Sequence, residues 1–193
     1  MHSSAKESGK QFFEIYCKSF PEDNLKIVEV GSQNVNGSLK EVAPTRFQYI
    51  GLDFAKANGV DIVLEDAYSF PLEDNSVDIV VSSSCFEHAD MFWLTYLEIM
   101  RILKPKGIFY LNAPTKGPHH RYPVDCWRFY PDAGKALTNW GKRNNYNNIL
   151  LESYIYNADT WGDFVGVFLK DESYKHEFTT RIIDTKQNIN HKR

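Results

Sequence analysis

Five short apolar runs recur along the first 112 residues, and they constrain the fold more than any other feature of this sequence. They span residues 25–30, 48–53, 60–64, 76–82 and 107–112. Their length, and their richness in Val, Ile, Leu and Tyr, indicate buried strands rather than helices. Strands that are apolar almost throughout belong to parallel sheets covered on both faces. We therefore predict an α/β fold with a single, doubly wound, mostly parallel sheet.

A helix follows the fourth run, and a second helix leads into the end of the sheet. The apolar positions of residues 90–103 recur at helical spacing, and Asp90 would cap that helix. Pro105 and Gly107 would end it. A helix is also predicted over residues 131–143, beginning at Pro131.

The chain is expected to form one domain with polar ends. Residues 1–10 are predicted to be a flexible tail, residues 11–170 the single domain, and residues 171–193 a polar, frayed tail. Two further strands, at 149–156 and 164–169, would close the sheet with an antiparallel C-terminal edge.

Composition excludes several classes of function. The formal charge is −3 and no basic stripe is present, so we expect no nucleic-acid partner. The three cysteines have no CxxC pairing, which argues against a disulfide framework or a zinc knuckle. The polar N-terminus and the short apolar runs predict neither a signal peptide nor membrane insertion. The expectation is a cytoplasmic protein that acts on small molecules.

Three turns at strand ends carry residues suited to a nucleoside. Gly31 follows the first strand, where a glycine lets a ligand approach the backbone closely. Asp53 ends the second strand, where a carboxylate can accept hydrogen bonds from ribose hydroxyls. Asp66 and Ala67 follow the third strand, where a carboxylate can meet the amine of an adenine. These carboxyl ends meet at one edge of the sheet.

Together these turns resemble class I S-adenosylmethionine-dependent methyltransferases, in particular the compact methyltransferase-domain group called type 11. The resemblance implies a Rossmann-like domain, an S-adenosyl-L-methionine cofactor and methyl transfer. It runs from about Lys26 to Trp140. Its carriers are Val28-Glu-Val-Gly-Ser32, Tyr49-Ile-Gly-Leu-Asp53, Asp61-Ile-Val-Leu-Glu-Asp-Ala67, residues 70–80, Cys85-Phe-Glu-His88 and residues 98–107.

The resemblance also assigns the cofactor contacts. Glu29 takes the acidic position before the turn, and Ser83 and Ser84 would line the methionine and sulfonium side. The full set of cofactor-binding residues is Glu29, Gly31, Ser32, Gln33, Asp53, Phe54, Asp66, Ala67, Ser83 and Ser84. The sequence departs from the family where further glycines are common, because Gln33 and Val35 occupy those positions. Gly37 is the candidate to replace them.

The acceptor side is predicted to lie after the fourth and fifth strands. His88 follows the fourth strand, and the loop of residues 117–130 follows the fifth. The candidate bases are His88, His119 and His120, and the candidate acceptor contacts are Arg121, Tyr122, Asp125, Trp127 and Arg128. The His-Arg-Tyr-Pro-x-Asp-x-x-Arg-Phe stretch is similar to family members associated with polysaccharide and glycan assembly. That resemblance implies O-methylation of a small-molecule or sugar hydroxyl.

Several alternatives stay open on the sequence. His88 would also suit a packing role beside the following helix, and the aromatic loop could simply cover the sheet edge. His119, His120, Asp125 and Cys126 could form a metal site, but their spacing matches no trusted signature, so no metal is predicted. The competing functions are a non-catalytic cofactor-binding or assembly module and a nicotinamide-dependent sugar oxidoreductase. Oligomeric state is not determined.

Overall fold

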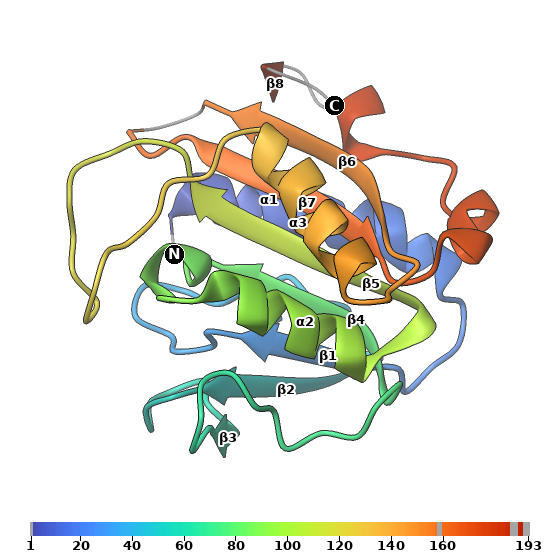
Figure 1. Cartoon of the computed structure of the whole chain (residues 1–193), viewed down its shortest axis with the longest axis horizontal. Coiled ribbons are helices and arrows are strands. Elements are labelled where there is room, and N and C mark those ends of the chain that lie inside the picture. The colour runs from blue at the N-terminus through green and yellow to red at the C-terminus, as the bar shows by residue number, and fades with distance from the viewer. Residues whose placement is uncertain (1, 158–159, 186–188, 191–193) are drawn as a thin grey trace.

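The computed structural model describes residues 2–157, 160–185 and 189–190 of the chain, and its core is one mixed sheet (Figure 1). The eight strands of the sheet lie in the order β3-β2-β1-β4-β5-β7-β6-β8. They are β1 Lys26–Val30, β2 Gln48–Asp53, β3 Ile62–Val63, β4 Val77–Ser83, β5 Leu103–Pro114, β6 Ile149–Tyr156, β7 Asp163–Leu169 and β8 Ile189–Asn190.

The sheet has the predicted α/β topology. Strands β1 to β5 pair in parallel, whereas β7 runs antiparallel to both β5 and β6. The strand order reverses between β1 and β4, with β2 and β3 on one side and β5 on the other. The prediction of a mostly parallel sheet with an antiparallel C-terminal edge is confirmed. Strand β3 is shorter than predicted, with two residues in place of five.

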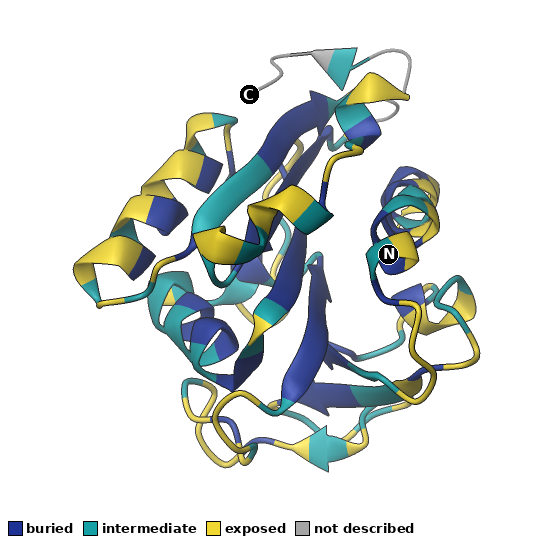
Figure 2. Cartoon of the chain, turned by 90° about the vertical axis from the view of Figure 1, so that its right-hand side faces the viewer, coloured by how far each residue is buried: buried dark blue, intermediate teal, exposed yellow. Residues whose placement is uncertain are grey.

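Helices cover both faces of the sheet. Helices α2 (Phe92–Ile102) and α3 (Asp132–Arg143) pack on one face, and α1 (Ser3–Tyr16) packs on the other (Figure 2). Each face has its own apolar cluster, one of which includes Tyr96 of α2 and the other Phe12 of α1. No helix within the described ranges is long and apolar enough to cross a lipid bilayer.

The N-terminal segment is a packed helix, so the prediction of a flexible tail over residues 1–10 is wrong for its described part. Helix α1 begins at Ser3, and Ala5 and Ser8 are fully buried. A Cβ atom on Gly9 would lie 2.3 Å from Leu39 Cδ2. The buried face of residues 3–10 therefore consists of small side chains. The spacing of large apolar residues does not reveal a buried helix face of this kind.

The C-terminal segment also contributes to the core. Phe178 and Ile182 are buried, so the prediction of a frayed tail over residues 171–193 is wrong for residues 171–185. The buried Glu152 carboxylate holds this segment by accepting hydrogen bonds from the Ile182 and Ile183 N–H groups, both at 3.0 Å. It also accepts one from the Tyr16 hydroxyl at 2.5 Å. Residues 186–188 and 191–193 lie outside the described part.

The helix-to-strand passage before β5 differs from the sequence expectation. Helix α2 begins at Phe92, and no side-chain hydrogen bond caps its N-terminus, so the prediction of Asp90 as a cap is wrong. Pro105 and Gly107 lie inside β5 instead of ending the helix. The β4–β5 register shifts between the Val77–Leu103 and Ile79–Ile108 pairs. An irregularity of this kind accommodates a proline within a sheet.

We expect Glu152→Ala to destabilise the fold by about 3 kcal/mol, because it removes the acceptor of the Tyr16 hydroxyl and of the Ile182 and Ile183 N–H groups. Urea denaturation followed by circular dichroism measures the change. Glu172→Ala, at an exposed position of the 3-10 helix Glu172–Glu177, is the control and should stay within about 0.5 kcal/mol of the parent. Equal stability of the two variants would contradict the role assigned to Glu152.

Candidate functional site

A crevice lies at the carboxyl ends of β1, β2 and β4, where the strand order reverses. It consists of two adjoining cavities of about 110 and 260 Å³. The residues that line both cavities are Gly31, Asp53, Phe54, Cys85 and His88. This is the position at which doubly wound sheets bind ligands. The three turns predicted from the sequence therefore converge, with one exception at Asp66.

Gly31 makes the tight turn at the tip of β1 possible. Its φ is +79°, and a Cβ atom there would lie 2.4 Å from both Cβ and Sγ of Cys85. The N–H groups of Gly31 and Ser32 donate to the Leu52 carbonyl at 2.9 and 3.1 Å, which fixes the turn against β2. No side chain fits between this turn and the one after β4.

Asp53 joins the tips of β1 and β2. Its carboxylate is 6% exposed and accepts hydrogen bonds from the N–H groups of Gln33 at 3.2 Å and Ala55 at 3.3 Å. A carboxylate has about four acceptor positions, so capacity remains for a ligand in the crevice. Phe54, 55% exposed, lies beside it at the rim of both cavities.

Glu29, on β1, is hydrogen-bonded to the loop that follows this strand. The buried carboxylate accepts hydrogen bonds from the Tyr49 hydroxyl at 2.9 Å and the Ser38 hydroxyl at 3.1 Å. Burial raises the pKa of Glu29. Within the loop, the Gly37 N–H donates to the Asn34 side-chain oxygen at 2.9 Å, and Gly37 has a φ of +108°. Side chains and one glycine thus hold a turn that otherwise lacks the expected glycines.

The third turn supplies an apolar wall rather than a carboxylate. Ala67 lines the larger cavity together with Leu64 and Tyr68. Asp66 lines neither cavity, and its exposed carboxylate accepts a hydrogen bond from the Tyr68 N–H at 2.8 Å. A short side chain that closes its own turn in this way does not reach the crevice.

Ser83 and Ser84, at the end of β4, line the smaller cavity. Ser84 has a φ of +52°, and its N–H donates to the Asn112 carbonyl at 3.1 Å. Cys85 is a crevice residue that the sequence analysis did not identify, because a lone cysteine without a paired base carries no signal. Burial raises its pKa to about 12, so its thiol is neutral and a packing group.

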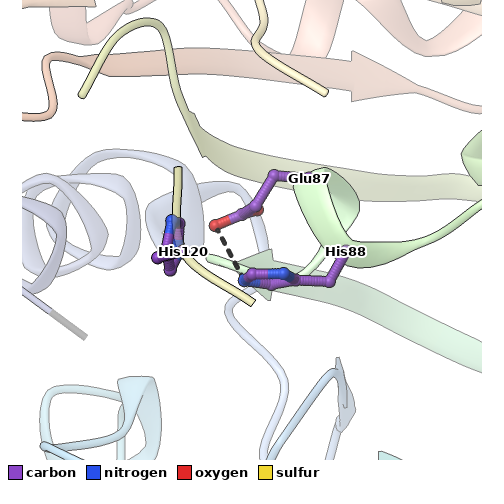
Figure 3. A group of neighbouring side chains, drawn as sticks. All are labelled: Glu87, His88 and His120. Carbon is purple, nitrogen blue, oxygen red and sulfur yellow. Dashed lines mark ion pairs between the residues drawn. The ribbon is translucent and has the colours of Figure 1, made fainter. Parts of the chain in front are cut away.

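His88 lies in the crevice. It lies in the 3-10 helix η3 (Phe86–His88), lines both cavities, and bonds through Nδ1 to the Val124 carbonyl. Burial lowers its pKa, which keeps the imidazole neutral near pH 7. The His120 ring stands edge-on to it, with ring centroids 4.9 Å apart, and Glu87 lies beside both (Figure 3).

The predicted acceptor contacts Asp125 and Arg128 pair with each other. Arg128 donates to both carboxylate oxygens, at 2.5 and 2.8 Å, and also to the Pro118 carbonyl at 3.0 Å. The Arg128 hydrogen bonds hold the pKa of Asp125 well below its usual range. The His120 N–H donates to the same carboxylate at 2.7 Å. The Asp125–Arg128 pair stabilises the loop, because both side chains form hydrogen bonds with other groups of the loop.

Of the other candidate residues in this loop, some line the crevice and others lie outside it. Tyr122, 48% exposed, lines the smaller cavity. His119 and Arg121 are exposed and line neither cavity. Trp127 donates from Nε1 to the Ala89 carbonyl at 3.0 Å, and its ring packs edge-on against Phe92. Of the candidate residues in this loop, the structure brings Tyr122 to the crevice and His120 beside His88.

Comparison with known proteins agrees with this geometry. Residues 30–111 match the methyltransferase-domain family. An uncharacterized methyltransferase of Mycobacteroides abscessus is 27% identical over 106 residues, which are 51% of this chain and 40% of that protein. The chain thus spans well under two thirds of the length of this curated relative.

Solved structures share the fold at low sequence identity. The YcgJ protein of Bacillus subtilis aligns with a TM-score of 0.63 at 13% identity, over 89% of this chain and all of that one. The 1,6-didemethyltoxoflavin-N1-methyltransferase of Burkholderia thailandensis, solved with S-adenosylhomocysteine, aligns with a TM-score of 0.64 at 10% identity, over 88% and 79%. Residues 30–111 are thus similar to the methyltransferase-domain family, and the chain shares its fold with these solved structures.

Proposed function

We propose that this chain transfers the methyl group of S-adenosylmethionine to a hydroxyl oxygen of a small-molecule acceptor, with sugars and glycans as the acceptor class. One observation carries the proposal: His88 lines both cavities of the crevice that Gly31 and Asp53 form. A neutral imidazole therefore lies within the cofactor crevice itself. Proton removal is the task that a hydroxyl acceptor adds to methyl transfer.

The crevice fits the cofactor on its own chemistry. The Ser32 hydroxyl oxygen is buried at the glycine turn and has no hydrogen-bond partner among the described residues, so a polar ligand would satisfy it. Asp53 would hold the ribose hydroxyls, and the apolar wall of Leu64 and Ala67 would flank the adenine. Glu29 and Ser83 lie on the side proposed for the methionine end.

The chain's own residues orient the acceptor and remove its proton. A bound cofactor would supply an electrophilic sulfonium methyl group, to whose carbon the acceptor oxygen would bond as the C–S bond breaks and S-adenosylhomocysteine leaves. The Val124 carbonyl selects the His88 tautomer with a proton on Nδ1, which leaves Nε2 free to accept the hydroxyl proton.

The sugar assignment rests on the loop after β5. The exposed ring of Tyr122 at the mouth of the smaller cavity offers a flat apolar surface of the kind that packs against a sugar face. Arg128 does not support a phosphate clamp, because Asp125 and Pro118 already use its guanidinium donors. Arg121 is the exposed cation of this loop that could meet an anionic substituent.

The fold alone does not select the reaction. The [4+2]-cyclase SpnF aligns with this chain at a TM-score of 0.62 and 13% identity, over 84% of this chain and 80% of that one. The proposal therefore depends on the residues of the crevice rather than on the sheet. The glycine turn, which departs from the family pattern at Gln33 and Val35, is held by the Asn34–Gly37 and Glu29–Ser38 hydrogen bonds.

Asp53→Ala should weaken S-adenosylhomocysteine binding at least tenfold, about 1.4 kcal/mol, because it removes the ribose acceptor. Asp66→Ala should leave the affinity within about twofold, because that carboxylate lines neither cavity. Isothermal titration calorimetry measures both constants, and circular dichroism checks folding. If Asp66→Ala loses as much affinity as Asp53→Ala, then the Asp66 carboxylate contacts the adenine as the sequence predicts. The placement of Asp66 outside the crevice would then be wrong.

For the chemical step, we expect His88→Gln to lower kcat for sugar-hydroxyl methylation about 10²–10⁴-fold while leaving S-adenosylhomocysteine affinity near the parent value. Transfer of labelled methyl groups to a panel of sugar nucleotides and free glycosides measures the rate. The matched control is His176→Gln, at an exposed histidine in the Glu172–Glu177 helix. Full turnover by His88→Gln would remove His88 from the mechanism.

A further inference from the structure

Three side chains able to bind metal converge beside the smaller cavity. Glu87 and His88 come from η3, and His120 comes from the loop after β5. One potential ligand atom from each lies within 4.8 Å of the other two. Figure 3 shows the three side chains pointing toward a common space, with Glu87 Oε1 and His88 Nε2 3.7 Å apart. Residues 32 positions apart in the sequence thus meet at one point.

The carboxylate of Glu87 lacks a partner that a buried charge requires. The residue is 1% exposed, and its Oε2 atom has no hydrogen-bond partner among the described residues. A carboxylate removed from water is stable only when it is paired, protonated or bound to a cation. No lysine or arginine forms an ion pair with Glu87 within the described ranges.

His88 has a hydrogen-bond partner on its other ring nitrogen, whereas His120 Nδ1 lies near a carboxylate without forming a hydrogen bond to it. His88 bonds through Nδ1 to the Val124 carbonyl, which directs the Nε2 lone pair toward Glu87. His120 has its Nδ1 atom 3.4 Å from the Asp125 carboxylate, which Arg128 holds in place. Metal-binding histidines in proteins typically have this kind of partner, a backbone carbonyl or a carboxylate on the other ring nitrogen.

The loop is tied to η3 at the cluster itself. The N–H groups of Cys126 and Trp127 both donate to the Glu87 carbonyl, at 2.7 and 3.1 Å. Because the backbone of Glu87 anchors the loop, the distance between Glu87 and His120 is set by the fold and not by flexible side chains alone. Preformed donors of this kind lower the entropic cost of binding an ion.

We propose that Glu87, His88 and His120 form a binding site for a divalent first-row cation such as Zn²⁺ or Mn²⁺. Two imidazole nitrogens and one carboxylate oxygen suit these ions and leave open coordination positions. The inference rests on the proposed function for its role: because His88 also lines the crevice, an open position would face the acceptor hydroxyl and favour loss of its proton. In the metal-bound protein the cation would replace His88 as the group that activates the acceptor.

These three proposed ligands differ from the four residues that the sequence alone suggested for a metal site. His119 is exposed, Asp125 is occupied by Arg128, and the Cys126 thiol donates to Asp90 at 3.4 Å. His120 is the member that the two sets share. Glu87 was not considered, because a single glutamate in a strand-end turn has no spacing signature.

The test is metal binding to the full chain after chelator treatment and buffer exchange. Titration calorimetry with ZnCl₂ and, separately, MnCl₂ should give one site per chain for at least one of the two ions. Glu87→Gln and His120→Gln should each weaken that binding 10- to 100-fold. His119→Gln, at the exposed neighbouring histidine, should bind as the parent does. No binding of either ion, or parent-like binding by Glu87→Gln, overturns the proposal.

Two further measurements separate this inference from the proposed function. The ion should raise the Tm of the parent but not that of Glu87→Gln, and a similar rise in both would place the ion elsewhere and overturn the site. S-adenosylhomocysteine affinity, measured by calorimetry without added metal, tests the cofactor crevice alone. If the parent protein binds S-adenosylhomocysteine but neither metal ion, the cation site is refuted and the methyltransferase proposal stands.

Discussion

The reversal of strand order between β1 and β4 is the constraint on which the site depends. Chain connections leave the two strands in opposite directions, so no connection covers the space between their carboxyl ends. At that point Gly31 and Cys85 approach so closely that a Cβ atom on the glycine would lie 2.4 Å from the cysteine. The crevice is thus a property of the backbone, and the side chains around it determine its chemistry.

Those side chains are fixed by hydrogen bonds to the backbone of neighbouring turns. Asp53 accepts from the loop after β1, and the Val124 carbonyl orients His88. Arg128 and Asp125 brace the long loop that carries His120 and Tyr122 toward the crevice. This arrangement prepares the site before any ligand binds, which is how an enzyme keeps the cost of positioning out of the chemical step.

The opposite face of the sheet shows how the two ends of the chain complete the fold. Buried Glu152 on β6 connects the Tyr16 hydroxyl of α1 to the backbone at Ile182 and Ile183. The sheet would otherwise expose one apolar face, because α2 and α3 both lie on the other. Helix α1 and residues 171–185 therefore belong to the domain.

The sequence by itself determined the sheet and the first two turns of the crevice. Apolar runs and strand-end residues are local features, so β2 and β6 were predicted with their observed bounds and Gly31 and Asp53 with their place at one edge. Only the tertiary structure decided which long-range neighbours meet. It paired Arg128 with Asp125, turned Asp66 away from the crevice, and brought Glu87 to His120, because such contacts depend on how loops distant in sequence pack together.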